Sequence, residues 1–324
     1  MKIAAIDIGS NALRLQIKDC SQPDFLLSLE SLREGEYYER VPLKSGMDVF
    51  AAGNILPPTK IRLTLALQHF ATVMRQYGVS RYRAVATSAY RDARNGQEVI
   101  SRAGKDSGLN IEIIPGDEEA RLTRLSFMPP QEWKDDYFLF VDVGGGSTEI
   151  SVTRQGQLLY GHSFQVGSMR YLCNNQSPEQ ERMLDDKIKE IHHDCTPLHY
   201  IAAGGCVKFM DKYLEKEKRS KEKRSKEKRS KEKRSKEKGV RRGIIPVSDM
   251  EAVYADLQTK TVSQIIEHYD IAEERAVILT PACSIFLRIA AGIGAETINV
   301  PAIGVRNGIL AELHRQTNGE ADGN

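Results

Sequence analysis

Cysteine is scarce and scattered in this chain of 324 residues. Its five cysteines form no Cys-x-x-Cys pair, so the sequence indicates neither a zinc site nor a disulfide framework. The adjacent His192 and His193 also lack metal-ligand spacing, because neighbouring side chains on a helix point about 100° apart. We therefore expect reduced thiols in a cytoplasmic protein.

Long apolar runs are also missing. No stretch approaches the roughly 18 to 20 consecutive apolar residues of a membrane span. The apolar residues at the N-terminus reach Asp7 too soon for the core of a signal peptide. With 40% hydrophobic residues, the composition suits a globular enzyme large enough for two domains, and we expect no membrane partner.

The net charge of +2 conceals an uneven distribution. Residues 215–242 contain 16 Lys or Arg and six Glu, because 216–238 repeats the pentapeptide Ser-Lys-Glu-Lys-Arg. The rest of the chain holds 30 basic and 38 acidic residues, a formal charge of −8. The repeat has no apolar residue to bury, which favours a solvated helical extension or disordered insertion over a polyanion-binding arm. Net charge therefore does not favour nucleic acid as a partner.

Apolar periodicity predicts an α/β chain with short turns between its strands. Residues 59–77 carry apolar side chains at helical spacing and predict a long helix. Strands are predicted at 3–8, 13–17, 25–32, 82–87 and 111–114, and then at 137–143, 148–153, 157–160, 200–203 and 298–300.

A unit of strand, Gly/Ser turn and strand occurs twice, headed by Asp7 and by Asp142. This weak internal duplication predicts two similar domains. We place the first at residues 1–129 and the second at 130–305. The C-terminal helix within 306–324 is expected to pack back on the first domain.

The two acid-headed turns carry the groups that a phosphate chain needs. Glycines let backbone N–H groups approach closely, hydroxyls donate hydrogen bonds, and carboxylates are ligands that Mg²⁺ prefers. A single such turn is usually an ordinary β-hairpin, but two in one chain favour a phosphate site, with Asp7, Asp142 and Glu149 as candidate metal ligands. The candidate binding residues are Asp7, Gly9, Ser10 and Asn11 in the first turn, and Gly144, Gly145, Gly146, Ser147 and Thr148 in the second.

Residues 86–95 form a third candidate element. A strand ends and a helix begins at Thr87 and Ser88, which present hydroxyl and N–H groups. Arg91 and Asn95 are spaced one helical turn apart, so we expect them to share a face, where Arg91 could clamp a phosphoryl group. Taken alone, a solvated helix face explains this segment equally well.

Residues 115–120 form the fourth. Glu119 lies in the first turn of a predicted helix after Pro115-Gly116, where a carboxylate could act as general base for an attacking water. The local sequence by itself favours acids that merely stabilise a helix N-terminus.

Together these segments resemble the exopolyphosphatase / guanosine pentaphosphate phosphohydrolase (Ppx/GppA) family, in its short form without a C-terminal helical module. The resemblance covers about residues 1–312, apart from the basic repeat. The matching stretches, in the family's order and spacing, are Asp7-Ile-Gly-Ser-Asn, Ala86-Thr-Ser-Ala-x-Arg91-x-Ala-x-Asn95, Gly116-x-Glu-Glu119-Ala and Asp142-x-Gly-Gly-Gly-Ser-Thr-Glu149.

The resemblance implies two ribonuclease-H-like domains of the actin-like ATPase superfamily, with the active site in the cleft between them. It implies that Glu119 orients the attacking water, that Asp142 and Glu149 position metal or water, and that Arg91 binds phosphate together with the glycine turns. The implied cofactor is Mg²⁺, with Mn²⁺ as an alternative. The implied partner is inorganic polyphosphate or a phosphorylated guanosine nucleotide, and a homodimer is consistent with the family.

Two positions depart from the family pattern. Ala12 stands where the family has a second serine, and Cys206 follows Gly204-Gly205 where the family has threonine. Ala12 has no hydroxyl to donate, and the thiol of Cys206 donates hydrogen bonds more weakly than a hydroxyl does. Because the positive charge of the chain lies in the basic repeat, we expect the affinity of the cleft to come from two glycine turns, Arg91 and a metal, in an otherwise acidic body.

Three functions stay open at this point. The favoured one is a metal-dependent phosphohydrolase that cleaves the end of an anionic phosphate chain. The second is a non-catalytic phosphate-chain or alarmone-binding protein, in which Ala12 and Cys206 mark lost activity. The third is an actin-like ATPase or kinase, for which Gly204-Gly205 is the one hint of an adenosine pocket.

Overall fold

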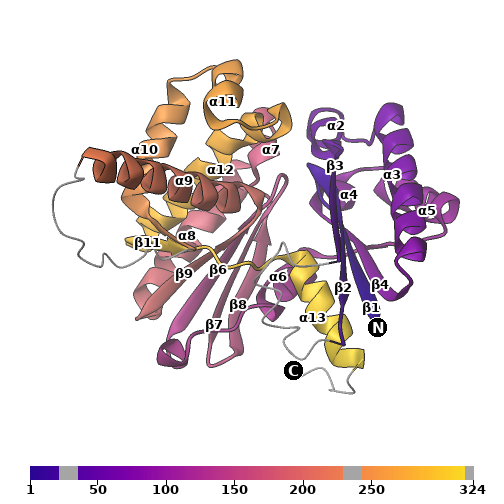
Figure 1. Cartoon of the computed structure of the whole chain (residues 1–324), viewed down its shortest axis with the longest axis horizontal. Coiled ribbons are helices and arrows are strands. Elements are labelled where there is room, and N and C mark those ends of the chain that lie inside the picture. The colour runs from indigo at the N-terminus through magenta and orange to yellow at the C-terminus, as the bar shows by residue number, and fades with distance from the viewer. Residues whose placement is uncertain (22–35, 229–242, 318–324) are drawn as a thin grey trace.

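The computed structural model describes residues 1–21, 36–228 and 243–317, and it has two α/β halves that are each built on one sheet (Figure 1). The strand predicted at 25–32 lies outside the described residues. So do the later part of the basic repeat, from residue 229, and the last residues, 318–324.

The first sheet has five strands in the order β3-β2-β1-β4-β5. The first three strands form an antiparallel meander, whereas β4 and β5 run parallel to β1. Alternate residues of β1 enter two different cores. Ala4 and Ile6 share one with helix α3 (Pro57–Gln76), and Ile3 and Ala5 share the other with α6 (Gly116–Leu125) and α13 (Val305–Thr317). Burial on both faces explains the continuous apolar run at the N-terminus. The strands are β1 (Lys2–Ile8), β2 (Ala12–Asp19), β3 (Tyr37–Pro42), β4 (Val79–Ala86) and β5 (Glu112–Ile113).

The second sheet repeats this topology. Its order is β10-β11-β9-β6-β7-β8, in which β6, β7 and β8 form the antiparallel meander and β9 and β11 are the parallel strands. The added edge strand β10 pairs antiparallel with β11. The predicted duplication is therefore a repeated fold. The strands are β6 (Tyr137–Val143), β7 (Thr148–Arg154), β8 (Gln157–Phe164), β9 (Leu198–Ala203), β10 (Ile244–Pro246) and β11 (Thr297–Asn299).

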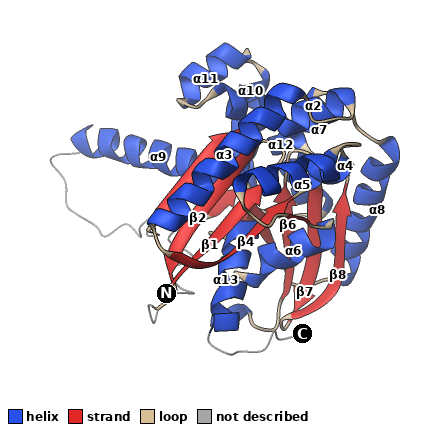
Figure 2. Cartoon of the chain, turned by 90° about the vertical axis from the view of Figure 1, so that its right-hand side faces the viewer, coloured by secondary structure: helices blue, strands red, loops and turns tan. Residues whose placement is uncertain are grey.

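Helices cover both sheets (Figures 1 and 2). The first half contains α2 (Ser45–Ala52), α3 (Pro57–Gln76), α4 (Ser88–Asp92), α5 (Gly96–Ser107) and α6 (Gly116–Leu125). After the short helix η1 (Gln131–Trp133), the second half contains α7 (Ser168–Leu172), α8 (Pro178–Asp194), α9 (Gly205–Lys228), α10 (Val247–Gln258), α11 (Val262–Tyr269) and α12 (Glu273–Gly292). The last helix is α13 (Val305–Thr317).

Two helices test the expectations about the basic repeat and about membrane-spanning segments. Helix α9 continues into the basic repeat as far as Lys228 and projects away from the body in Figure 2. Helix α12 is long and apolar enough to cross a membrane by length and composition, but residues such as Leu279, Phe286 and Ile289 are buried in the core of the second half. A buried core helix accounts for its apolar character.

Helix α13 lies on the first sheet, although it follows the second half in the chain. Ile309 and Leu310 share a core with Ile3 of β1 and Leu122 of α6. The contact with α6 is close, because a Cβ atom at Gly308 would overlap the carbonyl oxygen of Leu122. The domain limits at residues 129 and 130 stay a prediction.

The close contact of α13 with α6 gives a stability prediction. Gly308→Ala should lower the free energy of unfolding by about 1 to 3 kcal/mol, because backbone must move to admit the methyl group. Gly161→Ala is the matched control, since a Cβ there would meet Leu158 at 3.7 Å, an ordinary contact. Thermal denaturation of the two variants and the parent checks this. Equal melting temperatures for Gly308→Ala and the parent would contradict the packing.

Candidate functional site

The two acid-headed turns meet across the boundary between the halves. A cavity of about 410 Å³ lies between them, lined by both halves and by α13. The structure brings most of the predicted residues together there: Asp7, Gly9, Ser10, Asn11, Thr87, Ser88, Glu119, Asp142, Gly144, Gly145, Gly146 and Ser147 all line this cavity.

The two turns are built alike. The backbone N–H of Gly9 donates to the carbonyl of Ala12 at 3.1 Å, and the N–H of Gly144 donates to the carbonyl of Ser147 at 2.9 Å. Glycine is needed at the point of contact, because a Cβ at Gly145 would lie 3.0 Å from the Cβ of Ser10. The missing side chain allows the second turn to pack directly on the first.

Arg91 and Glu119 form an ion pair beside the second turn. Nη1 of Arg91 lies 2.9 Å from Oε2 of Glu119 and also donates to the carbonyl of Ile114 at 2.9 Å. Burial and the nearby Glu149 raise the pKa of Glu119 well above its usual value, although Arg91 opposes the shift. A buried carboxylate with a raised proton affinity is suited to accept a proton at neutral pH.

Glu149 lies just behind the cavity wall and is buried. It accepts hydrogen bonds on Oε1 from the hydroxyls of Ser147 at 2.6 Å and Ser163 at 2.7 Å. Burial and the neighbouring Asp142 raise the pKa of Glu149 to about 7. Ser163 therefore joins the site, although nothing in its local sequence marks it.

The remaining two carboxylates each have a partner from a different element. Oδ2 of Asp142 accepts from the hydroxyl of Thr123 in α6 at 3.2 Å, and burial raises the pKa of Asp142 while Lys208 opposes the shift. Oδ2 of Asp7 lies 2.9 Å from Nη1 of Arg14. The strands thus deliver one acid from each half to the same cavity.

Two predicted binding residues lie elsewhere. The side chain of Asn95 pairs with the backbone of Ile55, accepting at 2.9 Å and donating at 3.0 Å. Helix α4 ends at Asp92, so the prediction that Arg91 and Asn95 share a helix face is wrong. The buried hydroxyl of Thr148 donates to the carbonyl of Val166 at 2.6 Å and does not line the cavity.

The cavity also contains cations that the sequence did not reveal. They come from both halves and from α13: Arg14, Arg40, Lys208, Lys212, Arg275 and Arg306. The expectation named the glycine turns, Arg91 and a metal, and it missed these six cations. The i, i+4 spacing of Lys208 and Lys212 after Gly204-Gly205 was the one available signal, since it places both on one face of α9.

These cations are crowded. Burial and the neighbouring Arg306 lower the pKa of Lys208 to about 7. Burial also lowers the pKa of Arg306 and of Arg275. Arg14 pairs with Asp7 and Arg40 with Glu274, but placing the other positive charges together in a buried cleft is unfavourable unless an anion compensates them. The cavity is therefore electrostatically suited to a polyanion.

The carboxylates fit a metal only in part. Among the described residues, no three acidic, histidine or cysteine side chains converge to hold an ion by themselves. Mg²⁺ is commonly bound through one or two carboxylates, with waters and substrate phosphates as the other ligands. Asp7, Asp142 and Glu149 provide enough oxygen ligands for this mode but not for a closed protein cage.

Comparison with known proteins identifies the family of this chain. The sequence pattern of the Ppx/GppA phosphatase family matches residues 39–317. The chain belongs to this family. Exopolyphosphatase 1 of Mycobacterium tuberculosis is 29% identical over 151 residues, which are 47% of this chain and 42% of that protein. Exopolyphosphatase 2 of the same organism is 31% identical over 174 residues, 52% of this chain and 53% of that protein. The matches thus span about half the length of these relatives.

Solved structures of this family share the fold. An exopolyphosphatase from Cytophaga hutchinsonii superposes with a TM-score of 0.74 at 20% identity and covers 100% of both chains. A Ppx/GppA family member from Aquifex aeolicus gives a TM-score of 0.68 at 19% identity, covering 98% of this chain and 99% of that chain. The predicted α/β fold with one sheet in each of two similar halves is confirmed.

The lowered pKa of Lys208 gives a pH prediction. Lys208 is charged below about pH 7 and loses its proton above it, so the affinity for an anionic chain should fall as the pH rises from about 7 to 9, by up to about tenfold per pH unit. In Lys208→Arg the cation persists, so the fall should be smaller. Titrating both proteins with polyphosphate at each pH checks this. If the affinity for polyphosphate depends on pH in the same way in the parent and in Lys208→Arg, the role of the Lys208 charge in binding is contradicted.

Proposed function

We propose that this protein hydrolyses the terminal phosphoanhydride bond of an anionic phosphate chain, either inorganic polyphosphate or guanosine pentaphosphate. The observation that carries the proposal is the meeting of a cation-lined cavity with the carboxylate of Glu119, which is 13% exposed and has a raised pKa. The names of the relatives, two of them exopolyphosphatases, support the same reaction class.

In the proposed reaction, Glu119 orients a water molecule and accepts its proton as the water oxygen attacks the terminal phosphorus. The bond from phosphorus to the bridging oxygen breaks, and the shortened chain leaves on that oxygen. Arg91 is placed to offset charge on the transferred phosphoryl oxygens, together with backbone N–H groups of the glycine turns. Positioning and electrostatics of this kind carry most of phosphoryl transfer.

We also propose a divalent metal, Mg²⁺ or Mn²⁺, as cofactor. Asp142 and Glu149, with Asp7 across the cavity, are the residues that would hold it. When bound, the metal would offset negative charge on the phosphoryl oxygens. The task of the cavity cations is a different one: they bind the part of the phosphate chain that does not react.

A non-catalytic sensor is the second candidate. Cys206 lines the cavity, and burial raises the pKa of its thiol to about 11, so it stays protonated and donates weakly. Ala12 likewise lacks a hydroxyl. These two positions would weaken binding, but they leave Glu119, Arg91 and the acids in place, which favours the enzyme.

Replacing Glu119 tests the proposed base. Glu119→Gln should lose about 10²- to 10⁴-fold in turnover, because a general base contributes about that much, while still binding the chain. Asp117→Asn is the matched control, since Asp117 lies on the same helical turn but is exposed. Phosphate release and equilibrium binding are measured for both variants. Undiminished release by Glu119→Gln would rule out the assigned role.

A substrate panel distinguishes the candidate functions. Polyphosphates of several lengths, guanosine pentaphosphate and ATP are each incubated with the protein and Mg²⁺ or Mn²⁺. The proposal expects release from polyphosphate or guanosine pentaphosphate to exceed release from ATP. Binding without release from any of them would favour the sensor, and faster hydrolysis of ATP would favour an actin-like ATPase.

A further inference from the structure

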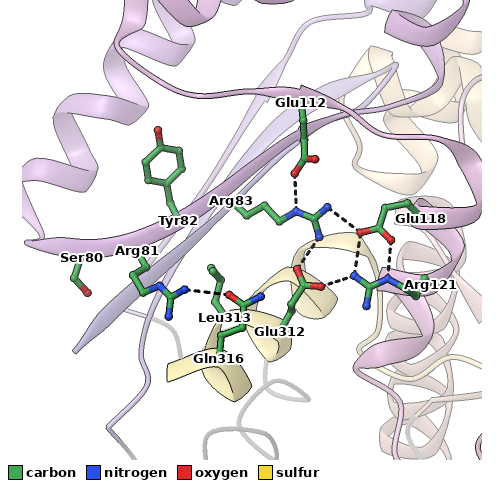
Figure 3. Close-up of a pocket in the computed structure, with 10 residues that line it drawn as sticks. All are labelled: Ser80, Arg81, Tyr82, Arg83, Glu112, Glu118, Arg121, Glu312, Leu313 and Gln316. Atoms are coloured by element: carbon green, nitrogen blue, oxygen red, sulfur yellow. Dashed lines mark hydrogen bonds and ion pairs between the residues drawn. The ribbon is translucent and has the colours of Figure 1, made fainter. Parts of the chain in front are cut away.

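Four charged side chains from β4, α6 and α13 form a closed ring (Figure 3). Arg83 of β4 contacts Glu118 of α6 at 2.8 Å and Glu312 of α13 at 2.7 Å. Arg121 of α6 contacts Glu118 at 2.6 Å and also pairs with Glu312. Glu112 of β5 adds a side branch, at 2.7 Å from Arg83. The ring joins three elements that are distant in sequence.

The geometry of the ring is tighter than that of an ordinary surface ion pair. The Glu312 side chain is only 9% exposed, and each carboxylate in the ring accepts from both arginines. Burial acts to raise the pKa of Glu118, but hydrogen bonds from Arg121 and Arg83 outweigh it and lower the pKa. Networks with paired, forked contacts fix side-chain direction better than isolated pairs do.

The ring is connected to the cavity through α6 and α13. Glu118 and Glu119 are neighbours in the first turn of α6, so their side chains point about 100° apart, one into the ring and the other towards the cavity. A rotation of α6 that broke the ring would therefore also move Glu119. Helix α13 carries Arg306, a cavity cation, in its first turn and Glu312 six residues later.

We propose that Glu312 is a positioning residue for Glu119: by binding Arg83 and Arg121, it fixes the rotation of α6 and so the aim of the proposed base. This inference rests on the proposed function of Glu119. It assigns a role in the reaction to the C-terminal helix, a segment nearly 200 residues away from Glu119 in sequence. Glu312 itself touches neither the cavity nor Glu119, so its effect passes through α6.

The test begins with Glu312→Gln, which keeps the shape of the side chain but removes its charge and one acceptor. Turnover per folded molecule should fall by about tenfold, whereas KM should stay within about threefold, because Arg14, Arg40 and Lys208 still hold the chain. Glu112→Gln is the control: it also loses a pair with Arg83, but Glu112 is 51% exposed and lies outside the ring. It should retain turnover within about twofold.

A double-mutant cycle separates positioning from general destabilisation. In a Glu119→Gln background, Glu312→Gln should cause little further loss, because there is no base left to position. A structural role alone would lower the residual activity by the same factor as in the parent. Equal losses in both backgrounds, or parental turnover for Glu312→Gln, would overturn the inference.

If Glu312→Gln is unfolded at the assay temperature, Glu118→Gln replaces it in the same cycle, with the same expected losses and the same contradicting results. The outcomes also distinguish the two proposals. A parent protein that releases no phosphate defeats the proposed function. Loss of activity in Glu119→Gln with full activity in Glu312→Gln defeats only the positioning role.

Discussion

The close contact between two glycine turns is the constraint on which the site depends. Each turn follows a buried strand that carries an acid, and the halves of the protein approach until Gly145 packs on Ser10. A Cβ atom at Gly145 would lie only 3.0 Å from the Cβ of Ser10, so glycine at this position favours the close approach of the two turns. The backbone N–H groups, the hydroxyls and the carboxylates of both halves then face one cavity.

Opposing charge is the second feature of this cavity. Burial raises the pKa of Glu119, Asp142 and Glu149, and it lowers the pKa of Lys208 and Arg306. A wholly acidic cavity would repel a phosphate chain, and a wholly basic one would bind it without a group to accept a proton. The presence of both signs in one cavity suits a division of tasks, in which cations hold the chain and carboxylates act at its end.

The local sequence predicted the strands, the turns and the site residues that lie within single motifs. The strand predicted at 137–143 matches β6, and the four motifs carried Glu119, Asp142 and Arg91 to one site because each motif sets its own turn or helix start. Helical spacing failed at Asn95, because the chain leaves the helix at Ala93 and Asn95-Gly96 begins a new one.

Residues whose direction is set by distant packing could not be predicted in the same way. Arg40, Arg275 and Arg306 belong to no motif, and they converge only when β3, α12 and α13 come together. Glu312 pairs with Arg83 across more than 200 residues of sequence. Such contacts are visible only after the two halves and the returning C-terminal helix are placed.

The most direct test of this account is to compare chain binding with phosphate release in protein stripped of divalent metal by a chelator. The account predicts that stripped protein still binds polyphosphate through its cavity cations, releases no phosphate, and recovers release when Mg²⁺ is restored. Undiminished release without metal, or loss of chain binding on stripping, would contradict the division of tasks between cations and carboxylates.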